Sequence, residues 1–173
     1  MSQQTPHEAI CRYLEDAIAA ENSFEHQFRQ FAKEVQQPEL KQLFEQHAEE
    51  TRMQERRLTV RLETLGGKPS GVKGFMANLF GFAPKVAQIG HDRTELGTQD
   101  LMMAFAIENS EIAMYEALAV SAAACGDLET EQLAREIQDE ERLTADKVWN
   151  HLAPCARQSF EKSTTAEHLR QAA

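Results

Sequence analysis

The hydrophobic residues of this chain recur at alternating steps of three and four along four long stretches, which is the spacing of one buried face of a helix. Residues 99–125 contain neither proline nor glycine and are predicted to form one helix. Its stripe consists of Leu101, Ala104, Glu108, Glu111, Tyr115, Leu118 and Ala122. Two carboxylates therefore lie on the line that a bundle would bury, where an unpaired charge costs several kcal/mol.

A first helix is predicted to begin at Pro6, since Thr5 and Glu8 form a capping box around a proline at the first helical position. Its apolar stripe runs from Ile10 to Val35, and Glu21 is the only charged member. Taken alone, Glu21 is equally well explained as a functional carboxylate and as a residue at the edge of the apolar face.

A second helix is predicted from Pro38 to the glycine pair at 66–67, which is a helix-stop signal. Its stripe is Leu40, Leu43, His47, Glu50, Gln54, Leu58, Leu62 and Leu65. His47 by itself is best explained as a core histidine with a hydrogen bond. The remaining charged residues of this helix suit a solvated face with ion pairs at helical spacing.

The last helix is predicted to follow Gly126, with Asp127 as its cap and Pro154 as its end. Its stripe is Leu133, Ile137, Glu140, Thr144 and Val148, so Glu140 is expected to be the buried acid. It is flanked by Asp139 and Glu141, and such runs of acids are usually solvated. We expect one bundle domain over residues 1–153 and a polar tail over residues 154–173.

Residues 68–97 join the two halves and are rich in glycine, with two short apolar pieces. They predict a long crossover with one or two short helices that carries the chain along the bundle. The predicted fold is therefore all-α: a four-helix bundle of two helical hairpins, with the third helix parallel to the second.

The polar stripe members of all four helices are predicted to share one layer. From the turn at Gly126, the acids at 108 and 111 lie about 25 Å back and Glu140 about 21 Å forward. From the turn near Gln37, Glu21 lies about 24 Å back and the polar pair of the second helix about 17 Å forward. Five carboxylates and one imidazole exceed the bases on these stripes, and two divalent metal ions would neutralise them. The candidate ligands are Glu21, His47, Glu50, Glu108, Glu111 and Glu140.

The same residues carry a resemblance to the YciE/YciF-like branch of the ferritin-like superfamily, from about residue 13 to residue 152. The segments concerned are Leu14-x-Asp16-Ala17, His47-x-x-Glu50-Thr51, Leu65-Gly66-Gly67-Lys68-Pro69, Glu108-x-x-Glu111-Ile112-Ala113-x-Tyr115 and Glu140-Glu141. The resemblance implies a dinuclear site with those six ligands, a homodimer, and a link to stress responses. Asn109-Ser110 departs from the His-Tyr that the family usually has there.

Composition narrows the range of partners. A net charge of −10 and the lack of a basic cluster argue against nucleic acid and anionic membranes. Three widely spaced cysteines and the lack of a signal sequence or membrane span favour the cytoplasm.

Three functions remain open at this stage. The first is an oxidase or peroxide-handling protein with two metal ions, iron in the first place and manganese as the other candidate, using oxygen or peroxide as a small oxidant. The second is a non-catalytic dimeric bundle, a binding or structural module in which a metal or a polar layer only stabilises the fold. The third is iron storage, which the weakly amphipathic tail does not favour.

Overall fold

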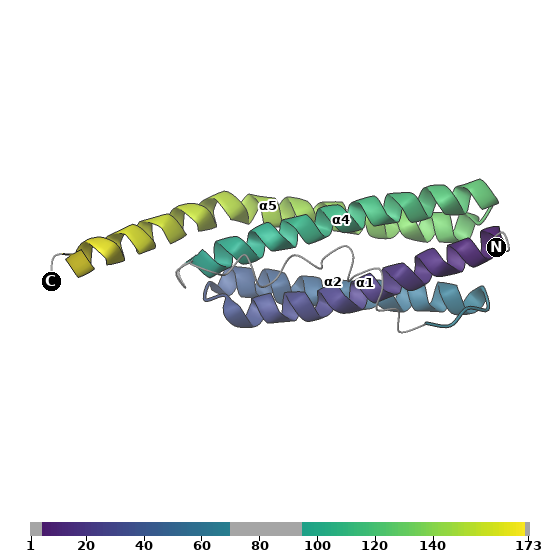
Figure 1. Ribbon diagram of the computed structural model, residues 1–173, viewed down its shortest axis with the longest axis horizontal. Helices are drawn as coiled ribbons and strands as arrows, with labels where there is room; N and C mark the ends of the chain where they lie inside the picture. The colour runs from purple at the N-terminus through teal and green to yellow at the C-terminus, as the bar shows by residue number, and fades with distance from the viewer. Residues whose placement is uncertain (1–4, 70–94, 172–173) are drawn as a thin grey trace, which may run out of the picture.

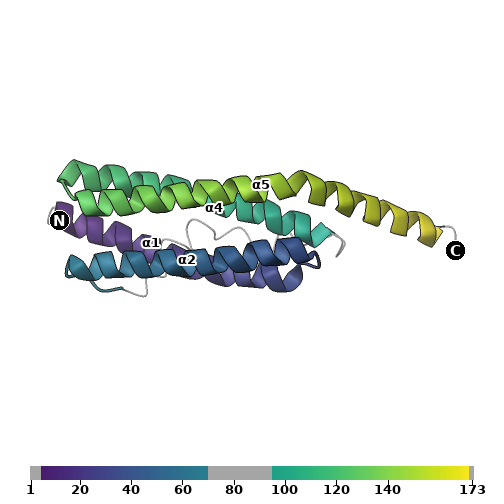
Figure 2. The same ribbon diagram turned by 180° about the vertical axis from the view of Figure 1, so that it is seen from behind.

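The structure is a computed structural model that describes residues 5–69 and 95–171, with side chains as far as residue 164. The described part consists of four α-helices arranged as two antiparallel hairpins that pack side by side (Figure 1). The helices are α1 (Pro6–Glu34), α2 (Pro38–Thr64), α4 (Leu96–Cys125) and α5 (Leu128–Gln171). The view from behind shows the same pairing, α1 with α2 and α4 with α5 (Figure 2). This confirms the predicted all-α bundle, with α4 running parallel to α2.

The starts of α1 and α5 and the end of α4 follow the predicted signals. The Thr5 hydroxyl accepts from the backbone N–H of Glu8 at 3.2 Å, and the Glu8 carboxylate accepts from the Thr5 N–H at 2.8 Å, which is the predicted capping box. Gly126 ends α4 with a φ of 80°, a conformation that glycine adopts without steric cost. Asp127 accepts from the Thr130 N–H at 3.0 Å and so caps α5.

The core consists of two apolar clusters, one on each side of a polar layer. One cluster is built around the aromatic rings of α1 and α2, including Phe24, Phe28 and Phe44. The other contains aliphatic side chains such as Leu58 and Leu118. Every stripe residue predicted for α1 and α4 is buried, so their registers are as predicted. The acidic residues of these stripes lie between the two clusters.

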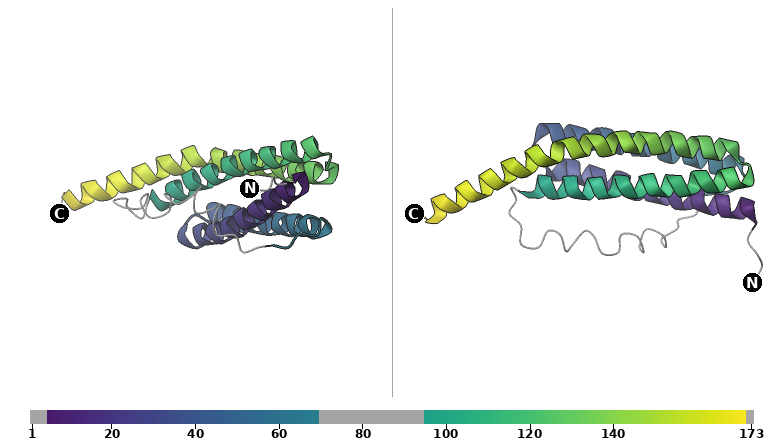
Figure 3. Two further views of the ribbon diagram at one scale, coloured as in Figure 1. Left: turned by 45° about the vertical axis from the view of Figure 1, so that its right-hand side comes forward. Right: turned by 90° about the horizontal axis from the view of Figure 1, so that it is seen from above.

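The prediction that Pro154 ends the last helix is wrong, because α5 continues through it to Gln171. A proline removes one backbone donor and leaves the carbonyl four residues earlier without a partner. Here that carbonyl belongs to Asn150, an exposed residue, so water can solvate it. Beyond the bundle α5 projects past the start of α4 (Figure 3). The separate polar tail over 154–173 stays a prediction.

The short helices predicted within the crossover fall on residues 70–94, which lie outside the described residues. None of the described helices has the length and apolar character that a membrane-spanning segment needs.

Candidate metal centre

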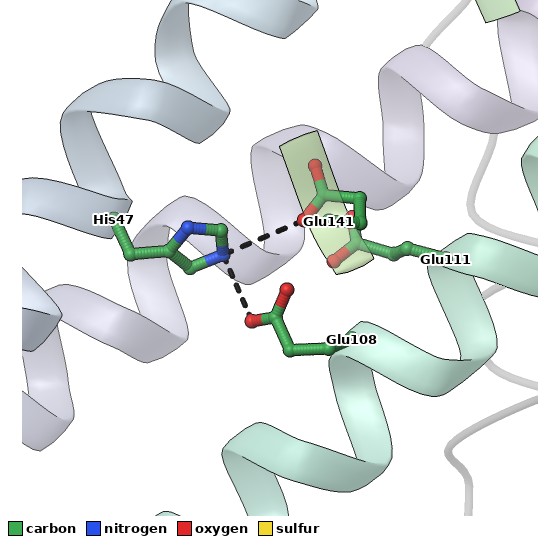
Figure 4. Close-up of side chains that lie close together, drawn as sticks. All are labelled: His47, Glu108, Glu111 and Glu141. Carbon is green, nitrogen blue, oxygen red and sulfur yellow. Dashed lines mark ion pairs between the residues drawn. The ribbon is translucent and has the colours of Figure 1, made fainter. Parts of the chain in front are cut away.

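Four buried side chains converge in the polar layer between the two hairpins. His47 comes from α2, Glu108 and Glu111 from α4, and Glu141 from α5 (Figure 4). Each offers one nitrogen or oxygen atom, and these four atoms all lie within 4.8 Å of one another. None of the four residues is more than 2% exposed. The spacing of three on α4 places its two acids on the same face, one turn apart.

Three acidic side chains and one aromatic ring surround the imidazole of His47. Its Nε2 lies 2.9 Å from Glu108 Oε1 and 3.9 Å from Glu141 Oε2. Its Nδ1 makes a 3.4 Å contact with Glu50 Oε2 at the edge of the layer. The ring of Phe28 packs edge-on against it, with 4.4 Å between centroids. The aromatic cluster therefore fixes the plane of the imidazole and keeps water away from that side.

Most carboxylate oxygens of the layer lack a hydrogen-bond partner within the described part of the chain. They comprise both oxygens of Glu111 and one oxygen each of Glu21, Glu108 and Glu141, while the other oxygen of Glu108 contacts His47 Nε2. Buried polar atoms of natural proteins almost always find a partner. Such a concentration of unpaired carboxylate oxygens around one imidazole is a suitable setting for a bound cation.

The electrostatics of the layer disfavour the charged carboxylates when no cation is present. Burial raises the pKa of Glu21 from 4.5 to about 8, against the opposing effect of the Tyr115 hydrogen bond. Burial and neighbouring acids raise the pKa of Glu111 and Glu141 well above 4.5. Burial works against the charged form of His47, but Glu108 and Glu50 outweigh it and raise its pKa from 6.5 to about 9. Without a metal, the layer therefore retains protons.

Glu21 is fully buried beside the cluster but is not one of its four closest members. The hydroxyl of Tyr115 donates a hydrogen bond to Glu21 Oε1, which leaves Oε2 without a partner. The sequence placed Tyr115 on the same stripe and one turn from Glu111. In the structure its hydroxyl packs on a buried carboxylate of α1.

The prediction that Glu140 is the buried acid of the last helix is wrong, since Glu140 is exposed and Glu141 is buried. Glu140 instead accepts from the guanidinium of Arg57 at 2.7 and 2.9 Å. Both acids stand three or four residues from Ile137 and Thr144, so helical spacing alone could not separate them.

Glu50 occupies an intermediate position. Its side chain is 40% exposed and lies between His47 and the ammonium of Lys147, 3.9 Å away. The hydrogen bond with His47 is the main cause that lowers the pKa of Glu50. The buried face of α2 passes through Thr51 instead. Glu50 therefore contacts the imidazole from outside the buried cluster.

The four atoms fit a divalent metal ion. Opposite ligands of an octahedral ion with bonds of about 2.1 Å are about 4.2 Å apart, so a small inward movement would suffice. Carboxylates combined with one imidazole suit iron or manganese. Glu108, Glu111 and Glu141 could each supply one or two oxygens, and His47 could supply Nε2.

The architecture and this site define a ferritin-like helical bundle with a carboxylate- and imidazole-lined core. Residues 5–161 match the family described as a domain of unknown function (DUF892), and the chain belongs to that family. No curated protein matches the chain.

Solved structures support the same fold. A protein from Xanthomonas campestris pv. campestris is 29% identical, with a TM-score of 0.77 over 92% of this chain and 98% of that chain. The E. coli stress protein YciF is 23% identical, with a TM-score of 0.78 over 90% and 99%. A ferritin-like, diiron-carboxylate protein from Bacillus anthracis is 19% identical, with a TM-score of 0.69 over 87% and 99%. The resemblance to the YciF-like branch is confirmed.

Proposed function

We propose that this protein binds a pair of divalent metal ions, iron first and manganese second, in the layer between its two hairpins. The observation that carries the proposal is the convergence of four buried ligand groups from three helices, most of whose carboxylate oxygens lack a hydrogen-bond partner within the described part of the chain. A bundle core with carboxylates from facing helices is a known setting for two metal ions. The similarity to a diiron-carboxylate protein supports the same assignment.

The proposed role of the bound metal is redox chemistry with oxygen or peroxide, because a pair of iron ions supplies one-electron steps that protein side chains cannot. The chain's own residues would bind and orient the ions and exclude water. Phe28 seals the side of His47, and Tyr115 keeps one oxygen of Glu21 occupied.

Metal content of protein purified without a histidine tag tests this function. Elemental analysis is expected to find about two iron or manganese ions per chain. The double variant Glu108→Gln, Glu111→Gln keeps the side-chain volumes and is expected to lose them. Glu116→Gln changes an exposed acid of the same helix and is expected to retain them. If the wild type takes up no metal after anaerobic loading with ferrous iron, the proposal is wrong.

A homodimer is part of the proposal, and the outer face of α4 supports it. Met102 and Val120 are 59% and 52% exposed, and Ala106, Ala113 and Ala117 lie exposed between them. An exposed apolar stripe along one face of a helix is a candidate contact surface for a second chain. Light scattering is expected to give twice the chain mass for the wild type and the single mass for Ala113→Glu. A monomeric wild type would contradict this part.

A further inference from the structure

Gln54 is a fully buried residue of α2 at the edge of the polar layer, where its side-chain amide contacts two acids of α5. It is 1% exposed. Its Nε2 donates to Glu141 Oε1 at 2.5 Å and to Glu140 Oε2 at 3.1 Å. A side-chain amide nitrogen has two hydrogens, so both are engaged by adjacent carboxylates of the same helix. One of these carboxylates points into the core and the other points outward.

The outward carboxylate is itself fixed. Arg57, three residues after Gln54 on α2, donates from Nη1 to both oxygens of Glu140 at 2.7 and 2.9 Å. Its Nη2 donates to Glu136 Oε2 at 3.2 Å. A continuous chain of hydrogen bonds therefore runs from the surface through Glu140 and Gln54 to Glu141. The charged members strengthen it, because hydrogen bonds to ionised groups are stronger than neutral ones.

The hydrogen bond to Glu141 occupies only one of its oxygens. The other, Oε2, has no hydrogen-bond partner within the described part of the chain and lies 3.9 Å from His47 Nε2. The Gln54 amide thereby directs a single oxygen of Glu141 towards the imidazole. We propose that Gln54 is a positioning residue of the metal site, which makes Glu141 a ligand through one oxygen and keeps Glu140 out of the core.

A merely structural amide would be expected to pair at both ends. The Oε1 atom of Gln54 is buried and has no hydrogen-bond partner among the described residues. A buried, half-satisfied amide costs stability compared with an apolar side chain of similar size. The arrangement is therefore poor as core packing, and orienting Glu141 accounts for it. Residues that hold metal ligands by hydrogen bonds typically change metal affinity 10- to 100-fold when they are removed.

This inference rests on the proposed function. Cobalt(II) binding tests both, because the wild type tests the metal site and the Gln54 variants test the role of Gln54. Titration calorimetry gives the dissociation constant and the visible spectrum reports the coordination of the ion. Gln54→Met keeps the length of the side chain without its donor, and Gln54→Asn keeps the amide but withdraws it from Glu141. Both variants are expected to bind cobalt(II) about 10- to 100-fold more weakly than the wild type, with an altered spectrum.

Leu58→Ala is the matched control, because Leu58 is a fully buried residue of α2 one turn beyond Gln54. It is expected to lower the denaturation midpoint but to leave the dissociation constant and spectrum unchanged. Equal binding and identical spectra for the wild type and either folded Gln54 variant would overturn the role of Gln54 alone. So would an equal loss of affinity in Leu58→Ala. A wild type that binds no cobalt(II) would overturn the proposed function, and this inference with it.

Discussion

Raising the pH should destabilise the metal-free protein, because its buried layer retains protons more strongly when folded than when unfolded. His47 has a folded pKa of about 9 against 6.5, so its stabilising charge is complete below pH 6.5 and is lost as the pH rises through 9. Glu21 has a folded pKa of about 8 against 4.5, so its penalty is absent below pH 4.5 and complete above 8. Both groups lower the free energy of unfolding as the pH increases.

The size of the effect follows from these values. One pKa unit corresponds to about 1.4 kcal/mol, and between pH 6 and pH 9 either group alone removes about 3 kcal/mol of stability. Glu111 and Glu141 change stability in the same direction. The groups are coupled, so their contributions do not add in full. We expect a total loss of at least about 3 kcal/mol, a large part of the stability of a domain of this size.

Urea denaturation followed by circular dichroism at pH 6, 7.5 and 9, in the presence of a chelator, measures this loss. Asp100→Asn is the suitable background, because burial raises the pKa of Asp100 to about 7 and gives it a pH dependence of the same sign. In that background the free energy of unfolding of the Glu21→Gln variant should decrease less steeply with pH. The free energy of unfolding of metal-loaded protein should depend much less on pH, since bound metal replaces the protons. A metal-free stability that stays constant or rises from pH 6 to 9 would refute the reasoning.

Three further outcomes are expected. Asp100→Asn should raise the free energy of unfolding at pH 8 by about 2–4 kcal/mol in urea titrations, because it removes a buried carboxylate whose Oδ2 has no hydrogen-bond partner among the described residues. Glu141→Gln should weaken cobalt(II) binding at least tenfold by calorimetry, whereas Asp139→Asn, an exposed acid on the same helix, should leave it unchanged. Arg61→Met should cost about 2–4 kcal/mol, because the guanidinium bonds the acidic start of α5, and Arg56→Met on the exposed face should cost almost nothing.

Sequence periodicity was sufficient to predict the buried side of a helix wherever one face of that helix is apolar along its whole length. The stripe of α1 is interrupted only by Glu21, and its aromatic side chains leave a single orientation that buries them. In α4 the outer face is apolar as well, so periodicity is weaker there. The two acids at 108 and 111 still identified the buried side, because they share a face with Tyr115 and Leu118.

Ion pairs and hydrogen bonds between α2 and α5 determine features that the periodicity of one helix does not predict. For α2 the sequence suggested a solvated face with ion pairs along one helix. Such pairs are present between Lys41 and Glu45 and between Arg52 and Glu49. Arg57 and Arg61, however, bond acids of α5, and this determines which side of α2 faces that helix. Such pairs depend on the distance between two helices, which no local pattern contains. The choice between Glu140 and Glu141 has the same origin, because Arg57 binds the outer acid and Gln54 donates to both.

The polar layer explains why this bundle combines a well-packed core with groups that oppose folding. Two apolar clusters bury aromatic and aliphatic side chains on either side of the layer, and their burial favours the folded state. Between them the carboxylate oxygens of Glu111, which have no hydrogen-bond partner in the described part of the chain, favour a state in which water can solvate them. The proposed divalent ion would remove that conflict, because it would replace the missing solvent with direct bonds. The apolar clusters therefore determine the fold, and the proposed metal determines how stable that fold is at neutral and alkaline pH.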